Sequence, residues 1–280
     1  MEYIDPIQYQ SKEDIFKNIE EIVEIYTKKS VVVIRDANLT FDEQVEFAKS
    51  FGEYLGWYPN KGSNSLHNYQ ENHKDISLAE VSERGVVLVP WHLEHVDYDS
   101  YSPIYAGIWN MFNFAGDTLD GNTYFTDTAK IYKDYPDRWK DLLDNSTVKY
   151  QSKRGDVLMT NQRPVDKHPV TGETLIRLEL NNEKIELESA YGSEPEDYQN
   201  SLFSEILEDF NEQVENNSEI RMIHMWREGD LLVTDLFKNA HAVTGGFDPE
   251  KREFYGIWVY RENPETEEFL EHLSKIYGEK

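Results

Sequence analysis

Residues 85–95 read Gly-Val-Val-Leu-Val-Pro-Trp-His-Leu-Glu-His, and this stretch says most about the architecture of the chain. Its four consecutive aliphatic residues, Val86–Val89, predict a buried β-strand. In an extended chain, residues two apart point to the same face, so His92 and Glu94 share a face directly after this strand. One imidazole and one carboxylate placed in this way can bind the same metal ion.

Further short apolar runs lie on both sides of this strand, with turn residues between them. They are Ser30–Arg35, Ile104–Phe114, Asn122–Phe125, Gly155–Met159, Thr174–Leu180, Met222–Trp226, Gly229–Thr234 and Phe254–Tyr260. So many short strands predict an antiparallel sandwich or barrel. The fold class that we expect is mainly β with flanking α-helices.

Apolar residues at helical spacing predict helices before and between these strands. The helices cover Lys12–Lys28, Thr40–Gly52, Thr128–Tyr135, Pro136–Leu143 and Pro195–Glu215. Thr40 and Glu43 form a capping-box pattern at the start of the second helix, and Gly52 is a natural helix stop. Residues 56–84 are polar and aperiodic, which predicts a long loop, and whether it forms a lid is left open. No linker divides the chain, so a single domain over residues 1–280 is expected.

The composition narrows the classes of partner. The formal net charge of -26, from 54 acidic and 28 basic residues, repels phosphate backbones and anionic lipids, so binding to nucleic acid or to a membrane is not expected. The chain has no cysteine, which leaves His, Asp and Glu as metal ligands. Neither a signal peptide nor a membrane span is recognisable, which predicts a cytoplasmic protein.

A third ligand would complete the two-histidine, one-carboxylate set that binds ferrous iron and leaves positions open. His241 is the best candidate, because it comes after the predicted strand Gly229–Thr234, at the end of that strand and of the loop that follows it. The residues alone leave two alternatives open. His92 and Glu94 are also typical of a salt-bridged surface strand, and His95 competes as a ligand, although its spacing from His92 directs it to the opposite face.

The order of these segments resembles the TauD/TfdA family of iron(II)- and 2-oxoglutarate-dependent oxygenases along most of the chain. Val31–Arg35 and Leu39–Gly52 are similar to the first core strand and helix of that family, and Trp91–Glu94 falls at its Trp-His-x-acid metal motif. Residues 226–241 follow its Trp-x-x-Gly-Asp and Asp-x5-His spacing. The resemblance implies a double-stranded β-helix core, a jelly-roll of the cupin type, in which the catalytic metal ligands are His92, Glu94 and His241.

Two more residues match positions that hold 2-oxoglutarate in this family. Arg252 follows His241 at the spacing of the co-substrate anchor, and a guanidinium offers a carboxylate planar, bidentate donors. Thr123, within Gly121–Asp127, matches a threonine whose hydroxyl helps to hold the distal carboxylate. Thr118 is an alternative, because it also follows a Gly-x pair.

Two departures from the family pattern bear on the substrate. The carboxylate ligand is Glu94, whereas much of the family has Asp at this position. A glutamate here is typical of a clavaminate-synthase-like branch that acts on amino acids and related amines. Position 256 is Gly where taurine-type enzymes have a second arginine, so a sulfonate substrate is not expected. The predicted substrate contacts are His67, Tyr69 and Asp97, for which plain surface positions are the alternative.

The resemblance implies an enzyme that uses Fe(II), 2-oxoglutarate and O2 to hydroxylate, or otherwise oxidise, an unactivated C–H bond of a small molecule such as an amino acid or amine. Succinate and CO2 would be released. Two other classes stay open, a non-catalytic metal- or ligand-binding barrel and a zinc hydrolase with the same ligands. The sequence specifies neither the substrate nor whether the chain forms a homo-oligomer.

Overall fold

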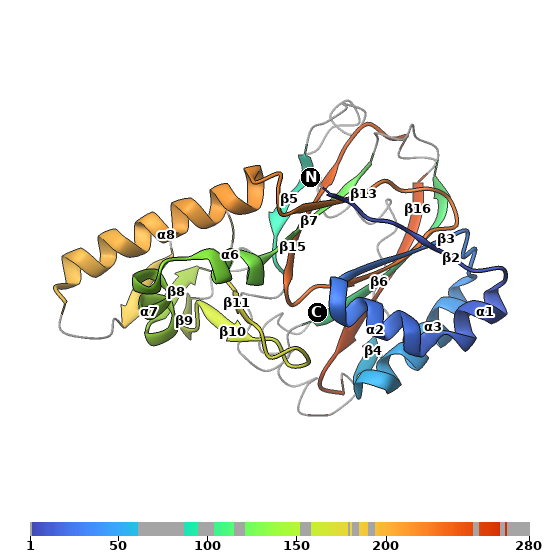
Figure 1. Ribbon diagram of the computed structural model, residues 1–280, viewed down its shortest axis with the longest axis horizontal. Coiled ribbons are helices and arrows are strands. Elements are labelled where there is room, and N and C mark those ends of the chain that lie inside the picture. The colour runs from blue at the N-terminus through green and yellow to red at the C-terminus, as the bar shows by residue number, and fades with distance from the viewer. Residues whose placement is uncertain are drawn as a thin grey trace.

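The computed structural model describes residues 2–60, 87–94, 104–114, 121–151, 158–178, 180, 185–189, 194–248, 252–263 and 267. Two large β-sheets form its centre, and helices lie on two sides of them (Figure 1). The expected fold class, mainly β with flanking helices, is confirmed at this level.

The larger sheet has the strand order β2-β3-β14-β6-β16-β4. Its strands are β2 (Ile7–Gln8), β3 (Val31–Arg35), β14 (Leu231–Asp235), β6 (Ile104–Phe114), β16 (Arg252–Tyr260) and β4 (Tyr58–Asn60). Every residue of β14 is buried. Leu231 and Val233 belong to the core beneath the N-terminal helices, whereas Leu232 belongs to the core between the sheets, as the alternation of side chains along a strand requires.

The smaller sheet has the order β1-β13-β7-β15-β5. Its strands are β1 (Glu2–Tyr3), β13 (Arg221–His224), β7 (Thr123–Asp127), β15 (Asn239–Thr244) and β5 (Val87–His92). The ladder between β15 and β5 is antiparallel and shifts register between His241 and Val243. Such irregularities change the direction of neighbouring side chains and are frequent beside active sites.

The two sheets pack face to face through large apolar side chains. Trp109 and Leu232 come from the larger sheet, Phe125 comes from the smaller one, and all three belong to one buried cluster with Trp226. Ring centroids of Trp109 and Phe125 lie 6.1 Å apart across this layer. The interior between the two sheets is therefore filled with close-packed aromatic and aliphatic side chains.

The N-terminal helices cover the outer face of the larger sheet (Figure 1). They are α1 (Lys12–Lys17), α2 (Ile19–Lys29) and α3 (Phe41–Leu55). The single helix expected over Lys12–Lys28 is broken at Asn18, whose side-chain amide donates to the carbonyl of Asp14 at 2.7 Å. Asparagine competes in this way with the helical hydrogen bonds of the main chain.

A second group of helices packs beside the smaller sheet, together with short strands. It consists of α6 (Thr128–Asp134), α7 (Asp137–Asn145), α8 (Glu196–Asn216), the sheet of β12 (Glu186–Ser189), β8 (Thr147–Gln151) and β9 (Leu158–Gln162), and the hairpin of β10 (Val165–Lys167) and β11 (Thr174–Ile176). Figure 1 shows α8 running outward from the sheets over this group. Within the residues that the structure describes, no helix is both long and apolar enough to span a membrane.

Gly52 does not end the third helix, contrary to the expectation from the sequence. The helix continues to Leu55, and Gly56, with φ of 67°, is the left-handed cap. The main-chain NH of Trp57 donates to the carbonyl of Gly52 at 2.8 Å, which turns the chain back against the helix. A Cβ on Gly52 would lie 2.7 Å from the carbonyl oxygen of Trp57, so Gly52 is needed for close packing rather than for its φ angle.

We expect Gly52→Ala to lower the free energy of unfolding by about 1–3 kcal/mol, because overpacking against main-chain atoms forces the turn to shift. Urea denaturation followed by circular dichroism measures the change. Gly56→Ala is the matched control, since a Cβ on Gly56 meets nothing within 4 Å and only its left-handed backbone is strained. A smaller loss in Gly52→Ala than in Gly56→Ala would contradict this explanation.

Candidate metal centre

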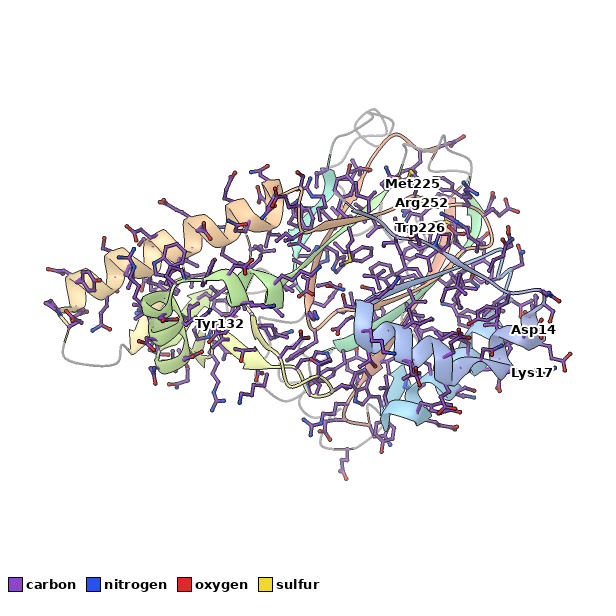
Figure 2. The ribbon with its side chains drawn as sticks, viewed as in Figure 1. Asp14, Lys17, Tyr132, Met225, Trp226 and Arg252 are labelled. Carbon is purple, nitrogen blue, oxygen red and sulfur yellow. The ribbon has the colours of Figure 1, made fainter. Side chains whose placement is uncertain are left out.

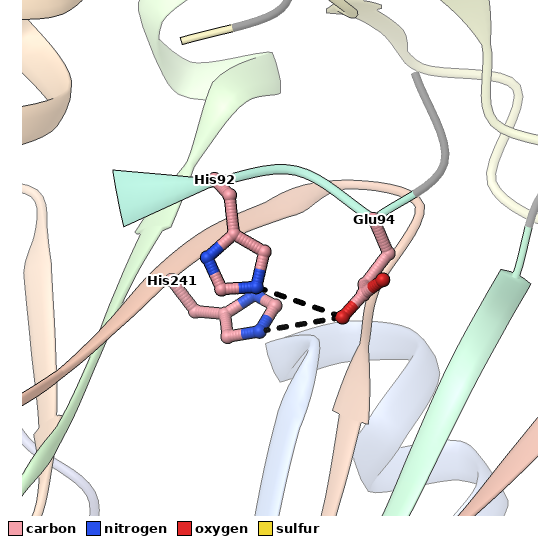
Figure 3. Close-up of side chains that lie close together, drawn as sticks. All are labelled: His92, Glu94 and His241. Carbon is pink, nitrogen blue, oxygen red and sulfur yellow. Dashed lines mark ion pairs between the residues drawn. The ribbon is translucent and has the colours of Figure 1, made fainter. Parts of the chain in front are cut away.

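The structure brings His92, Glu94 and His241 together at one edge of the smaller sheet (Figure 3). His92, the last residue of β5, is the direct partner of His241 on β15. Their ring centroids lie 4.1 Å apart. Oε1 of Glu94 lies 3.6 Å from Nε2 of His92 and 3.9 Å from Nε2 of His241. One ligand atom from each residue therefore lies within 4.8 Å of the others.

The position of His241 differs from the sequence expectation in one respect. It lies inside a separate strand, β15, and not at the end of the strand before it. Asn239–Thr244 consists mostly of small or polar residues, which gave no apolar run to recognise. The strand forms because it is paired on both sides, with β7 and with β5, and that pairing depends on segments distant in the sequence.

Neighbouring groups orient both imidazoles for metal binding. Nδ1 of His92 lies 2.8 Å from the carbonyl oxygen of Pro90, which can only accept its hydrogen bond, so Nε2 is the nitrogen that could bind a metal ion. His241 is buried, with the ring of Trp109 at 5.5 Å and the ring of Phe125 at 6.2 Å. Burial, and then the nearby His92, lowers the pKa of His241 to about 3, so its imidazole stays neutral and free to ligate.

The residues present fit a ferrous ion. Two neutral imidazole nitrogens and one carboxylate oxygen are the donor set of non-haem iron sites, which keep other positions open for co-substrate and oxygen. His92 and Glu94 are partly exposed while His241 is buried, so the group is accessible from the side of His92 and Glu94. Glu94 is the one negative charge of the group, and it would partly neutralise a bound divalent ion.

Arg252 and Thr123, the expected co-substrate residues, are linked by a chain of side-chain contacts through Phe254 and Trp226. The indole NH of Trp226 donates to the hydroxyl oxygen of Thr123 at 2.8 Å, which leaves the hydroxyl proton able to donate elsewhere. Arg252 begins β16, and its guanidinium lies 5.3 Å from the ring of Phe254, which in turn lies 6.2 Å from Trp226. Figure 2 shows Arg252 and Trp226 at the same end of the sheets.

Several residues singled out from the sequence lie outside the described part of the chain. They are the predicted substrate contacts His67, Tyr69 and Asp97, the alternative threonine Thr118, and the competing ligand His95. Their roles stay predictions.

A buried polar cluster around Asp230, close in sequence to Trp226, was not predicted from the sequence. Asp230 pairs with the guanidinium of Arg35, lies 3.2 Å from Nε2 of His224, and accepts from the main-chain NH of Arg227 at 2.8 Å. Arg35 also donates to the carbonyl of Met225 at 3.1 Å. The cluster holds the turn that carries Trp226. Asp230 is the last residue of the Trp-x-x-Gly-Asp pattern, but nothing in the sequence indicated His224 as its partner.

His224 makes stability depend on pH. Burial lowers its pKa below the ordinary 6.5, and the carboxylate of Asp230 only partly opposes this. The unfolded chain therefore takes up a proton at higher pH than the folded protein. The stability that His224 contributes is complete above about pH 6.5 and is lost as the pH falls, by up to about 1.4 kcal/mol per pH unit.

Urea unfolding of the wild type and of His224→Gln at pH 7 and pH 5 tests this dependence. Glutamine can still donate to Asp230 but does not titrate, so the free energy of unfolding of the variant should fall less between the two pH values. Equal falls in the two proteins would assign the pH dependence to other groups.

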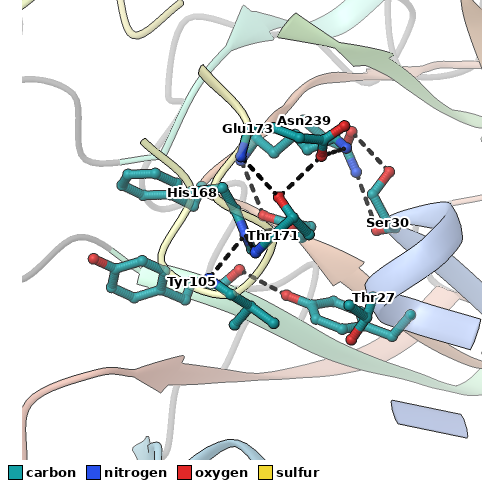
Figure 4. A network of polar contacts seen from close by, with 12 residues as sticks. Thr27, Ser30, Tyr105, His168, Thr171, Glu173 and Asn239 are labelled. Atoms are coloured by element: carbon teal, nitrogen blue, oxygen red, sulfur yellow. Dashed lines mark hydrogen bonds and ion pairs between the residues drawn. The ribbon is translucent and has the colours of Figure 1, made fainter. Parts of the chain in front are cut away.

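His168 has the contacts of a structural turn residue (Figure 4). Its Nδ1 accepts from the main-chain NH groups of Val170 and Thr171, and its Nε2 lies 2.8 Å from Asp235. Both side chains of the His168–Asp235 pair are buried. This pair attaches the β10–β11 hairpin to the turn between β14 and β15.

Comparison with known proteins gives a family match and similar folds. The chain matches the family described as "Taurine catabolism dioxygenase TauD, TfdA family" over residues 5–258. A taurine dioxygenase from Burkholderia xenovorans is 19% identical with a TM-score of 0.60, over 87% of this chain and 81% of that chain. AAD-2 in complex with Mn(II) and N-oxalylglycine is 21% identical with a TM-score of 0.59, over 89% of each chain. A search of curated protein sequences gave no match.

A His-Glu-His group at the edge of paired β-sheets is typical of non-haem iron enzymes. The family match covers most of the chain, so this chain belongs to the TauD/TfdA family. It is an iron(II)- and 2-oxoglutarate-dependent dioxygenase, and it uses O2.

Proposed function

We propose that this enzyme oxidises an unactivated C–H bond of a small amine or amino acid, with hydroxylation as the principal outcome and release of succinate and CO2. The observation that carries the proposal is the convergence of His92, Glu94 and His241. In this proposal these three side chains are the metal ligands. Bound ferrous iron supplies oxygen-activating chemistry that is coupled to decarboxylation of 2-oxoglutarate.

The other residues of the proposal bind and orient the co-substrate. Arg252 pairs with the distal carboxylate of 2-oxoglutarate, since a guanidinium stays charged and offers two parallel donors. Thr123 adds a hydroxyl donor, held in place by Trp226. Glu94 retains the carboxylate ligand, so no ligand position is vacant for a halide, which favours hydroxylation over halogenation.

A cationic or zwitterionic substrate is favoured over a sulfonate by the surroundings of Gly256. A Cβ on Gly256 would lie 3.1 Å from Cδ1 of Trp109, so the indole of Trp109 covers the position where a second arginine would begin. The net charge of -26 also favours cations over anions near the protein. Both observations support an amine or amino acid.

The strand order supports the expected double-stranded β-helix. Along the chain, β4, β6, β14 and β16 belong to the larger sheet, while β5, β7, β13 and β15 belong to the smaller one. The chain passes repeatedly from one sheet to the other, as in a jelly-roll. We propose this core within one domain over residues 1–280.

Anaerobic titration with ferrous iron and 2-oxoglutarate tests the proposed site. The chelated complex should produce a weak visible charge-transfer band in the wild type. Arg252→Ala should shift the titration to about 100-fold higher 2-oxoglutarate, because it removes a charge-assisted, bidentate pair. Arg221→Ala is the matched control, since Arg221 also lies over aromatic rings, those of Trp91 and Tyr124.

The outcomes test the proposed site residues and then the proposed substrate class. A wild-type band that weakens in Arg252→Ala but not in Arg221→Ala supports the proposal. Absence of a band in the wild type would contradict the proposed assignment of His92, Glu94 and His241 as the metal ligands. With the band established, succinate release is then measured with amines, amino acids and sulfonates, and stimulation by sulfonates alone would contradict the proposed substrate class.

A further inference from the structure

Arg177 is a buried arginine beside the metal centre, and it is not one of the proposed ligands. Only 8% of its surface is exposed. Its Nη1 donates to the main-chain carbonyl of Phe237 at 2.7 Å, and its Nη2 donates to the main-chain carbonyl of Glu94 at 3.2 Å. One guanidinium therefore connects two segments that are far apart in the sequence.

Both carbonyls belong to segments that carry proposed metal ligands. Glu94 is one of these proposed ligands, and it lies beyond the end of β5, where the ladder with β15 has stopped. Phe237 lies in the turn that leads from β14 into β15, the strand of His241. Arg177 thus fixes the distance between the main chain at Glu94 and the turn before His241.

The guanidinium itself is rigidly held. It lies 4.1 Å from the ring centroid of Phe237, so the same residue accepts a hydrogen bond and supports the planar face. The main-chain NH of Arg177 donates to the carbonyl of Pro164 at 2.9 Å, across the base of the β10–β11 hairpin. Burial lowers the pKa of the Arg177 guanidinium below its ordinary value, while the nearby Tyr105 and Asp166 oppose the shift.

The same hairpin has two more attachments to the turn between β14 and β15 (Figure 4). His168 contacts Asp235 at 2.8 Å, and Glu173 contacts Nζ of Lys238 at 2.9 Å. Lys238 also pairs with Asp127 at 3.1 Å. These contacts fix the hairpin against the turn before His241, whereas Arg177 also reaches the opposite ligand segment at Glu94.

We propose that Arg177 is a positioning residue that holds Glu94 and the turn before His241 at the separation needed for metal binding. The inference rests on the proposed metal ligands. Its physical basis is that a carboxylate at the end of a strand needs a fixed main chain to present one oxygen to an ion. Groups that orient metal ligands in this indirect way typically change metal affinity by about 10–100-fold when removed.

The test is a titration of the full-length apoprotein with Co(II) alone, followed by the visible absorption bands of the bound ion. Arg177→Met keeps the length and apolar contacts of the stem but removes both hydrogen bonds. Arg177→Lys keeps the charge but can reach only one carbonyl as a point charge. We expect about 10–100-fold weaker binding and altered bands in Arg177→Met, with partial recovery in Arg177→Lys.

Arg35→Lys is the matched control. Arg35 is also largely buried and also donates to a main-chain carbonyl, that of Met225, but its contacts lie around Asp230. It should lose thermal stability and retain the wild-type affinity and bands. If Arg177→Met fails to fold, the Co(II) affinity of Arg177→Lys is compared with that of Arg35→Lys under conditions of equal thermal stability. Weaker binding in Arg177→Lys then supports the positioning role.

The results distinguish this inference from the proposed function. If the wild type binds Co(II) and folded Arg177 variants bind it with the same affinity and bands, the positioning role is wrong and the metal centre stands. If the wild type binds no Co(II), the proposed metal centre fails and the role of Arg177 fails with it. Weaker binding restricted to the Arg177 variants establishes the role.

Discussion

Replacing Glu94 with glutamine is expected to lower the affinity for ferrous iron by more than about 100-fold, the upper end of the effect of an orienting group, and to abolish substrate-dependent succinate release. Glutamine has nearly the same shape but no negative charge. The imidazoles of His92 and His241 then remain, and the group has no negative charge left to neutralise a divalent ion. Anaerobic titration with ferrous iron measures the affinity.

Two controls separate the loss of a ligand from a general disturbance. Glu94→Asp keeps the carboxylate that much of the family uses at this position, so it should retain part of the affinity. Glu24→Gln removes an exposed carboxylate of α2 whose partner is Lys28 and should leave iron binding unchanged. Wild-type affinity in Glu94→Gln would show that this carboxylate is not a ligand.

The three proposed ligands could be predicted from the sequence, but for different reasons. His92 and Glu94 share a face because of the two-residue period of a strand, which is a local property. His241 was selected by its place after a predicted strand and by resemblance, because its pairing with His92 joins segments distant in the sequence. Family resemblance conveyed this long-range information, and the hydrophobic pattern alone did not.

The contacts of Arg177 could not be read from the sequence. The residue stands in Leu175-Ile-Arg-Leu178, where a charged residue among apolar ones suggests the exposed face of a strand. Its acceptors are main-chain carbonyls of Glu94 and Phe237, and every residue has such a carbonyl. Because main-chain carbonyls do not depend on residue type, the sequence cannot indicate which of them accept, and only the folded structure reveals this contact.

Gly52 and Asn18 show the same limit for local signals. Glycine after an amphipathic helix usually marks its end, but Gly52 is needed because Trp57 packs against it. The apolar spacing of the first helix continues through Asn18, although the helix breaks there. The spacing of apolar residues indicates which face of a helix is buried. It does not reveal a break in the helix, such as that at Asn18, when the same face stays buried on both sides of the break.

Asp230→Ala is expected to lower the free energy of unfolding by about 3–5 kcal/mol, the usual cost of removing one partner of a buried ion pair. Asp230 is completely buried, and its loss leaves the guanidinium of Arg35 without its carboxylate. The main-chain NH of Arg227 and Nε2 of His224 lose the same acceptor. Urea denaturation at pH 7 measures the change.

A double variant isolates the uncompensated charge as the cause. Arg35→Met combined with Asp230→Leu replaces both charges with apolar groups, so it should recover part of the stability that Asp230→Ala loses, as buried pairs exchanged for apolar residues often do. Lys17→Ala is the exposed control, because Lys17 lies on the outer edge of α1 and pairs only across the surface with Glu13 (Figure 2). If the double variant were as unstable as Asp230→Ala, the lost hydrogen bonds around Arg227 and His224, and not the unpaired Arg35, would account for the destabilisation.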